Sequence, residues 1–148
     1  MNYSLAIGLA ALGGMLLPIQ FLINARLSQG FESALWATTI SFVVGTLGLL
    51  VWIAARGQLG AANWSGALAL PWWAWVGGLM GAVYVSLTII TVPVVGPTAL
   101  VVLLILGQML AGTALDHFGI LTEAEPVSLQ KLLGLALVFA GTWMVVKA

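Results

Sequence analysis

Five long apolar stretches run along the chain, and short segments between them hold nearly all of the charged residues. No Asp, Glu, Lys or Arg occurs in residues 1–25, 33–55, 57–115 or 132–146. About 20 apolar residues in a helix cross a hydrocarbon core of about 30 Å, so 57–115 is long enough for two spans. Backbone polar groups in lipid must bond within the protein, and no strand-like alternation favours a barrel. The sequence therefore predicts an all-α membrane protein with five transmembrane helices.

Turn and capping residues set the expected limits of these helices. We expect a single transmembrane domain, residues 1–148, with helices at about 3–24, 33–55, 71–91, 97–116 and 128–147. Ser33 and Ser128 are placed to cap the second and fifth helices, and Gly119 to end the fourth. The intervening segments are predicted to be a polar loop at 26–32, a surface segment at 57–70 and a tight turn at 92–97.

The first apolar stretch resembles a retained span more than a cleaved signal. It has no Lys or Arg ahead of it, and it ends in Asn24-Ala25-Arg26 rather than in a small-x-small cleavage site. Pro18 lies inside this stretch and is expected to kink the helix.

Most of the seven tryptophans fall near the predicted helix ends. Such aromatic residues are typical of the membrane interface, where they anchor the spans. An alternative interpretation is that Trp72, Trp73 or Trp75 lines a pore and binds a cation by the face of its ring.

Composition narrows the class of function. Only 5% of the residues are charged, whereas soluble domains carry roughly 25%, and 62% are hydrophobic. The absence of cysteine rules out disulfides and thiolate metal sites, and a net charge of zero without a basic run argues against nucleic acid. No phosphate-binding loop, metal-ligand cluster or nucleophile elbow occurs, so we expect neither an enzyme nor a cofactor or metal site.

The positive charges are balanced across the membrane. Five spans put Arg26 and Lys147 on one side and Arg56 and Lys131 on the other. Because an excess of Lys and Arg normally fixes the cytoplasmic side, the chain is predicted to insert in both orientations. Opposed copies then form an antiparallel homodimer of ten helices, like the inverted repeats of secondary transporters. Alternatively, the N-terminal amine, the lipid composition or the loop lengths decide the orientation.

Small residues recur at helix-packing spacing. Such rows let helix backbones approach one another in lipid, where packing rather than hydrophobicity drives association. They comprise Ala37, Ser41 and Gly45; Gly77 and Gly81; Gly107 and Ala111; and Gly134 and Gly141.

Polar residues inside the spans are the candidates for solute binding. They tend to face the interior of a helix bundle, because a lone amide or hydroxyl is costly in hydrocarbon. The candidates are Gln20, Asn24, Ser41, Tyr84, Thr88 and Gln108. The alternative is that they pair with neighbouring helices and only hold the bundle together. Gln20 is the strongest candidate, because it lies in mid-span beside the Pro18 kink, where a freed carbonyl and an amide can both face a cavity.

Asp116 and His117 stand at the predicted end of the fourth helix. Asp116 is the only carboxylate close to a span, and a water-filled cavity that reached this pair would allow either residue to carry a proton. A surface position is the default. No acid lies in mid-membrane, which disfavours an exchanger built on a buried carboxylate.

Several runs resemble a known family. Residues 14–20 (GMLLPIQ) with 24–27 (NARL), 36–46 (WATTISFVVGT), 71–78 (PWWAWVGG), 107–108 and 116–119 resemble successive segments of the YdcZ-like family of the drug/metabolite transporter superfamily. The resemblance implies five-helix units that pair in opposite orientations, with four helices around a cavity and the last helping dimerisation. The related small multidrug-resistance proteins use a glutamate of the first helix for proton-coupled export, and this chain has none there.

The sequence thus predicts a multi-pass protein of the plasma (inner) membrane. We expect a secondary transporter or exporter that moves a small organic solute by alternating access as an antiparallel homodimer. The alternative is a non-transporting membrane subunit whose small-residue faces dock on a partner protein.

Overall fold

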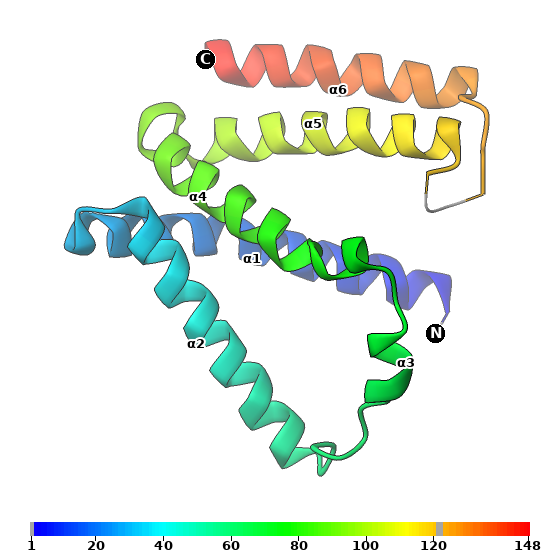
Figure 1. Cartoon of the computed structure of the whole chain (residues 1–148). Helices are drawn as coiled ribbons and strands as arrows, with labels where there is room; N and C mark the ends of the chain where they lie inside the picture. Colours follow the sequence, from blue (N-terminus) through cyan, green and yellow to red (C-terminus); the bar gives the residue numbers. More distant parts are fainter. Residues whose placement is uncertain (1, 121–122) are drawn as a thin grey trace. The chain divides into compact units, whose positions relative to one another are not determined.

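The described part of the chain, residues 2–120 and 123–148 of a computed structural model, is helical and contains no strand (Figure 1). Its helices are α1 (Tyr3–Phe31), α2 (Ala34–Ala55), α3 (Trp64–Leu68), the 3₁₀ helix η1 (Trp72–Trp75), α4 (Gly77–Val95), α5 (Pro97–Phe118) and α6 (Leu129–Lys147). Five spans are long and apolar enough to cross a membrane: α1, α2, η1 with α4, α5 and α6. The predicted fold class is confirmed.

The capping signals act as the sequence predicts. Ser33 Oγ accepts a hydrogen bond from the Trp36 amide at 3.3 Å, and Ser128 Oγ accepts one from the Lys131 amide at 3.2 Å. Each serine thereby satisfies one of the free N–H groups at a helix start. Gly119 ends α5 with a φ of 63°, in the left-handed region that glycine adopts most readily.

The loop predicted at residues 26–32 is wrong, because α1 continues through Phe31. Polar residues do not themselves break a helix, and Arg26 Nη1 donates to Gln29 Oε1 at 2.7 Å along the helix surface. The chain turns at Glu32, whose φ is 51°. With 29 residues, α1 is roughly 43 Å long and exceeds a hydrocarbon core of about 30 Å.

The tight turn predicted at residues 92–97 is also wrong. Pro93 lies inside α4, which continues through Val95. The break falls at Gly96, whose φ of 80° cannot continue a right-handed helix, and Pro97 then begins α5. A proline removes one helical hydrogen bond and the helix can continue past it, whereas a residue at positive φ ends the helix.

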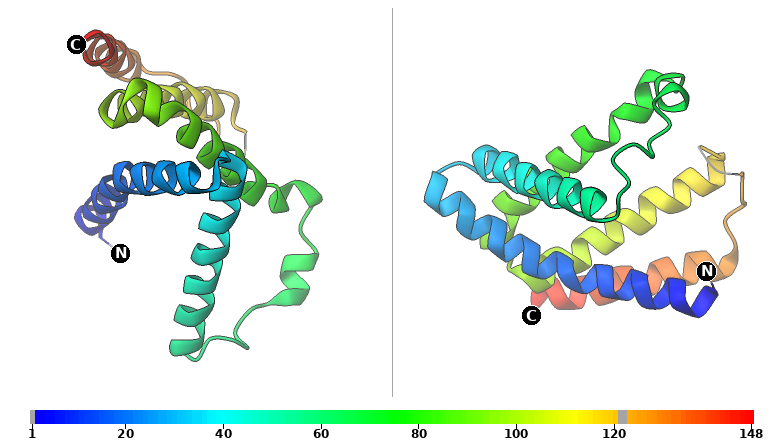
Figure 2. Two further views of the ribbon diagram at one scale, coloured as in Figure 1. Left: turned by 90° about the vertical axis from the view of Figure 1, so that its left-hand side faces the viewer. Right: turned by 90° about the horizontal axis from the view of Figure 1, so that it is seen from below.

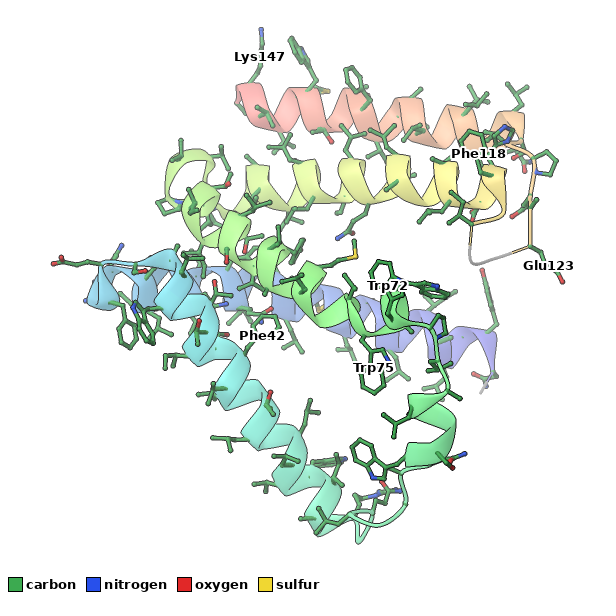
Figure 3. The ribbon with its side chains drawn as sticks, viewed as in Figure 1. Phe42, Trp72, Trp75, Phe118, Glu123 and Lys147 are labelled. Atoms are coloured by element: carbon green, nitrogen blue, oxygen red, sulfur yellow. The ribbon has the colours of Figure 1, made fainter. Side chains whose placement is uncertain are left out.

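The surface segment predicted at residues 57–70 contains a short helix. Asn63 Oδ1 accepts a hydrogen bond from the Gly66 amide at 3.0 Å and caps α3. After Pro71 the chain forms η1, whose Trp72 and Trp75 side chains extend outward from the ribbon (Figure 3). All seven tryptophans are exposed, which agrees with their expected role as anchors in the membrane interface.

The chain divides into two compact units. One consists of residues 19–90, and the other of residues 1–18 with 91–148. Helices α1 and α4 both continue from one unit into the other. The boundary follows Pro18 directly in α1, and in α4 it comes just before Pro93. Each crossing therefore lies beside a missing backbone hydrogen bond.

In the unit of residues 19–90, α4 supplies much of the packing. Its Val85 and Ile89 form a buried cluster with Ala37 of α2, and Leu27 and Tyr84 pack against this cluster. The share of buried residues is largest in the span that contains α4, 22% against 6% to 11% in the others. Phe42 of α2 lies beside Gly81 of α4, where an added Cβ would meet its ring at 3.4 Å.

In the other unit, α5 and α6 lie side by side (Figures 1 and 2). The hydroxyl of Thr142 in α6 is buried and donates to the Val102 carbonyl of α5 at 3.3 Å. The Thr142 hydroxyl thus joins α6 to α5 by a hydrogen bond to a backbone carbonyl of α5. The glycines Gly107, Gly134 and Gly141 have open space where a Cβ would lie.

Replacing Ala37 with leucine is expected to destabilise the protein by about 1–3 kcal/mol, because Ala37 is fully buried between α2 and α4. Thermal unfolding in detergent, followed by circular dichroism, measures this. The control is Ala54→Leu, an exposed alanine of the same helix. Equal unfolding temperatures for the two variants would contradict close packing at Ala37.

Candidate functional site

Three helices of the 19–90 unit supply the buried polar side chains from which a site can be built. On α1, residues Phe21, Asn24 and Leu27 follow one another at intervals of three and share a face. The Phe21 ring meets the Tyr84 ring edge to face, with centroids 6.4 Å apart. Leu27 packs against the cluster of Ala37, Val85 and Ile89. Asn24 therefore lies between two points at which α1 packs inside this unit.

Asn24 is the most unusual polar residue of this face. It is only 3% exposed, and its Nδ2 atom is buried without a hydrogen-bond partner. An unsatisfied buried donor costs about 1–3 kcal/mol. Native proteins contain few such groups, and each calls for an explanation such as a bound water, ion or ligand, so Asn24 is the first candidate for contact with a solute.

Tyr84 and Thr88 lie one turn apart on α4. Tyr84 is partly buried beside Phe21, and Thr88 is almost completely buried. The Thr88 hydroxyl donates to the Val85 carbonyl at 2.8 Å. Its proton is therefore already used, and the oxygen can act toward a solute only as an acceptor.

The pair of Thr38 and Ser86 was missed in the sequence. The two hydroxyls are 3.0 Å apart and join α2 to α4, while each oxygen also lies 2.9 Å from a carbonyl of its own helix, Ala34 or Ala82. The available signal was the position of Thr38, directly beside Ala37 in the row of small residues. Thr38 also lies one turn after Ala34, which packs against the buried cluster of Ala37, Val85 and Ile89.

An open groove of about 410 Å³ lies along α2 in this unit. The residues that line it are mainly apolar, and three threonines of α2 add hydroxyl groups. They include Thr38, Thr39, Thr46, Phe42, Leu47 and Ala82. Ser41, predicted as a solute contact, is partly buried on α2 and is not part of this lining.

The two glutamines do not join this set. Gln20 is exposed on α1, and Gln108 is exposed on α5, which belongs to the other unit. Asn24, Ser41, Tyr84 and Thr88 all belong to the 19–90 unit. The structure thus places five of the six predicted residues in one unit, four of them at least partly buried and Gln20 exposed.

Asp116 and His117 stand near the end of α5, and Asp116 belongs to an ionic cluster. Lys131 Nζ lies 3.3 Å from Asp116 Oδ2 and 2.7 Å from Glu125 Oε2. The Glu125 amide donates to the Asp116 carbonyl at 2.8 Å, which holds the acidic loop against the helix end. The His117 ring meets the Phe118 ring edge to face at 5.1 Å. No three His, Cys, Asp or Glu residues gather into a metal site in the part of the chain that the structure describes.

Comparison with known proteins extends over almost the whole chain. The sequence profile of the family described as "Putative inner membrane exporter, YdcZ" matches residues 5–144. Inner membrane protein YdcZ of Escherichia coli (strain K12) is 27% identical to this chain over an alignment of 151 residues. The alignment covers 99% of this chain and 98% of that protein. No solved structure matches the chain. These similarities and the five apolar helices place the protein in the inner membrane and favour a transporter over an enzyme.

Proposed function

Because the chain belongs to the YdcZ family, we propose that it is a secondary transporter that exports a small organic solute by alternating access. The proposed solute contacts are Gln20, Asn24, Ser41, Tyr84 and Thr88 in the 19–90 unit, and Gln108 in the other unit. The functional unit is an antiparallel homodimer in which each copy of residues 1–148 acts as one five-helix domain.

The observation that carries this proposal is the distribution of polarity inside the 19–90 unit. Asn24, Thr38 and Thr88 are buried there, whereas large apolar side chains of the same helices, such as Ile23 and Leu87, are exposed. Lipid can cover the apolar faces, and the polar groups are turned inward as a solute path requires.

Alternating access is supported by the form of α1 and α4. Each helix continues from one unit into the other beside a proline, and Pro18 and Pro93 each leave one carbonyl without its usual helical partner. Helices bend most readily at such positions. We infer that these two crossings are where the chain bends as the path opens to one side and then to the other.

The balance of positive charges supports the antiparallel homodimer. Arg26 is exposed near the C-terminal end of α1 and Arg56 at the C-terminal end of α2, and Lys131 and Lys147 stand near the two ends of α6. Each side of the membrane thus receives two basic residues, with no excess to fix the orientation. A two-fold axis in the membrane plane then relates an inward-open state to an equivalent outward-open state.

Asp116 and His117 are the proposed route for a coupled proton. They are the acid and the histidine nearest to the membrane core of α5, and Asp116 shares Lys131 with Glu125. A proton on Asp116 leaves Lys131 to Glu125 alone, which changes the contact between the end of α5 and the start of α6.

Transport is tested by flux into sealed vesicles that contain the purified protein, with protein-free vesicles as the baseline. A panel of radiolabelled small organic solutes supplies the probes. For any solute that moves, Gln20→Ala is expected to lower the rate about tenfold, the effect of losing one hydrogen bond to the solute. Gln130→Ala is the control, because Gln130 is exposed in the first turn of α6.

Two results would contradict the proposal. If no solute moves faster than in protein-free vesicles, transport is rejected and a docking subunit becomes the better interpretation. If Gln20→Ala and Gln130→Ala carry solute at the same rate, Gln20 does not line the path.

A further inference from the structure

The Asn24 amide is a hydrogen-bond donor for which the protein supplies no acceptor. The residue is 97% buried, its Nδ2 has no partner, and it lies between Phe21, which touches Tyr84, and Leu27, which packs on the α2–α4 cluster. The flanking contacts hold this part of α1 against its neighbours. The amide therefore stays in the interior of the unit, where a donor without a partner is costly.

The other buried polar groups of residues 19–90 offer a solute something different. Thr38 and Thr88 each lie within hydrogen-bond distance of a carbonyl of their own helix, as does the partly buried Ser86. A hydroxyl that has given its proton to a carbonyl can only accept. Among the fully buried polar side chains of this unit, Asn24 is thus the one with N–H groups to give, and the partly buried Tyr84 adds a hydroxyl that can donate or accept.

Charge restricts the class of ligand further. The charged side chains of residues 19–90 are Arg26, Glu32 and Arg56, and all three are exposed. A buried ion without an opposite charge is strongly disfavoured in a medium of low polarity. A neutral solute needs no such partner, and the buried face of α1 that carries Asn24 otherwise carries the apolar ring of Phe21.

We propose that Asn24 Nδ2 recognises the carbonyl oxygen of a neutral, amide-like solute, and that the site discriminates against cations and anions of the same shape. This inference rests on the transport function proposed above and specifies its substrate class. It follows from the unpartnered buried amide, the committed hydroxyls and the absence of a buried charge among the described residues 19–90.

The test uses the purified full-length protein and three probes of similar shape: benzamide, benzoate and benzylammonium. Equilibrium binding of radiolabelled benzamide is measured first, with the two ions as competitors. Benzamide is expected to bind at least about tenfold more tightly than either ion, and Asn24→Leu is expected to lose at least about tenfold in benzamide affinity. Gln130→Leu, which removes an exposed amide, is expected to bind as the wild type does.

Thermal unfolding of the ligand-free protein supplies a second readout, which also shows that the variant folds. Asn24→Leu is expected to unfold at a higher temperature than the wild type, because it removes a buried donor that has no partner. A lower unfolding temperature would mean that the amide already has a partner in the protein, and it would overturn the inference.

The remaining outcomes separate this inference from transport itself. Failure of benzamide to bind the wild type, equal binding by Asn24→Leu, or tighter binding of either ion would overturn the neutral-solute inference. Vesicle flux of a charged solute would do so as well, while leaving transport intact. Binding of benzamide through Asn24 without flux of any solute would reject transport and leave the binding site standing.

Discussion

Replacing Phe21 with alanine is expected to destabilise the protein by about 3 kcal/mol, the largest effect that we expect from a single truncation. Phe21 is 2% exposed and is among the largest fully buried side chains of the described chain. Alanine would leave a cavity and remove the edge-to-face contact with Tyr84 at 6.4 Å. The low end of the range for such truncations applies, because separated helices in a membrane still have lipid around them.

Chemical or thermal unfolding in detergent measures this change. The matched control is Phe139→Ala, because Phe139 is 59% exposed on α6 and its loss opens no internal cavity. A loss of similar size in both variants would contradict the packing of α1 on α4 at Phe21. Tyr84→Phe keeps the ring contact and is expected to retain most of the wild-type stability.

Added lysines are expected to turn a protein of mixed orientation into one of single orientation. The wild type has two basic residues on each side, and two further lysines on one side make the balance four to two. The pair Gln29→Lys and Gly30→Lys lies on the side of Arg26 and Lys147, and should hold the C-terminus in the cytoplasm. The pair Gln58→Lys and Gly60→Lys lies on the side of Arg56, and should hold it outside.

Reporters fused to the C-terminus measure the outcome, a fluorescent protein for the cytoplasmic side and alkaline phosphatase for the other. Wild type should be active with both, and each lysine variant with one. If the antiparallel homodimer is the transporter, each variant alone should lose flux and co-expression of the two should restore it. A wild type with a single orientation, or a lysine variant that transports alone at the full rate, would contradict the homodimer.

The spans could be predicted from the sequence because lipid imposes a simple rule on charge and length. Long uncharged stretches located all five, and Ser33, Ser128 and Gly119 placed three of their ends correctly. The errors at residues 26–32 and 92–97 share one cause, which is that neither polar residues nor a proline ends a helix by itself. In both places the chain turned only where a backbone adopted positive φ, at Glu32 and at Gly96.

The candidate site was predictable only in part. Polar groups are costly in lipid, so the burial of Asn24 and Thr88 can be predicted from their positions inside apolar stretches of the sequence. The contact of Thr38 with Ser86 depends on how α2 meets α4, and residues 48 positions apart carry no mutual signal in one sequence. The missing partner of Asn24 is likewise a property of its surroundings. That Gln20 and Gln108 line the path stays a prediction, which the vesicle experiment addresses.

An odd number of spans has a consequence for how such a protein can evolve. The chain crosses the bilayer with five helices, so it ends on the side opposite to its start. A gene duplication that joins two copies head to tail therefore starts the second copy on the far side, with every helix inverted. No extra linking helix is needed, as it would be for a unit with an even number. Once fused, the two halves are free to diverge, and each can collect the basic residues that fix its own direction.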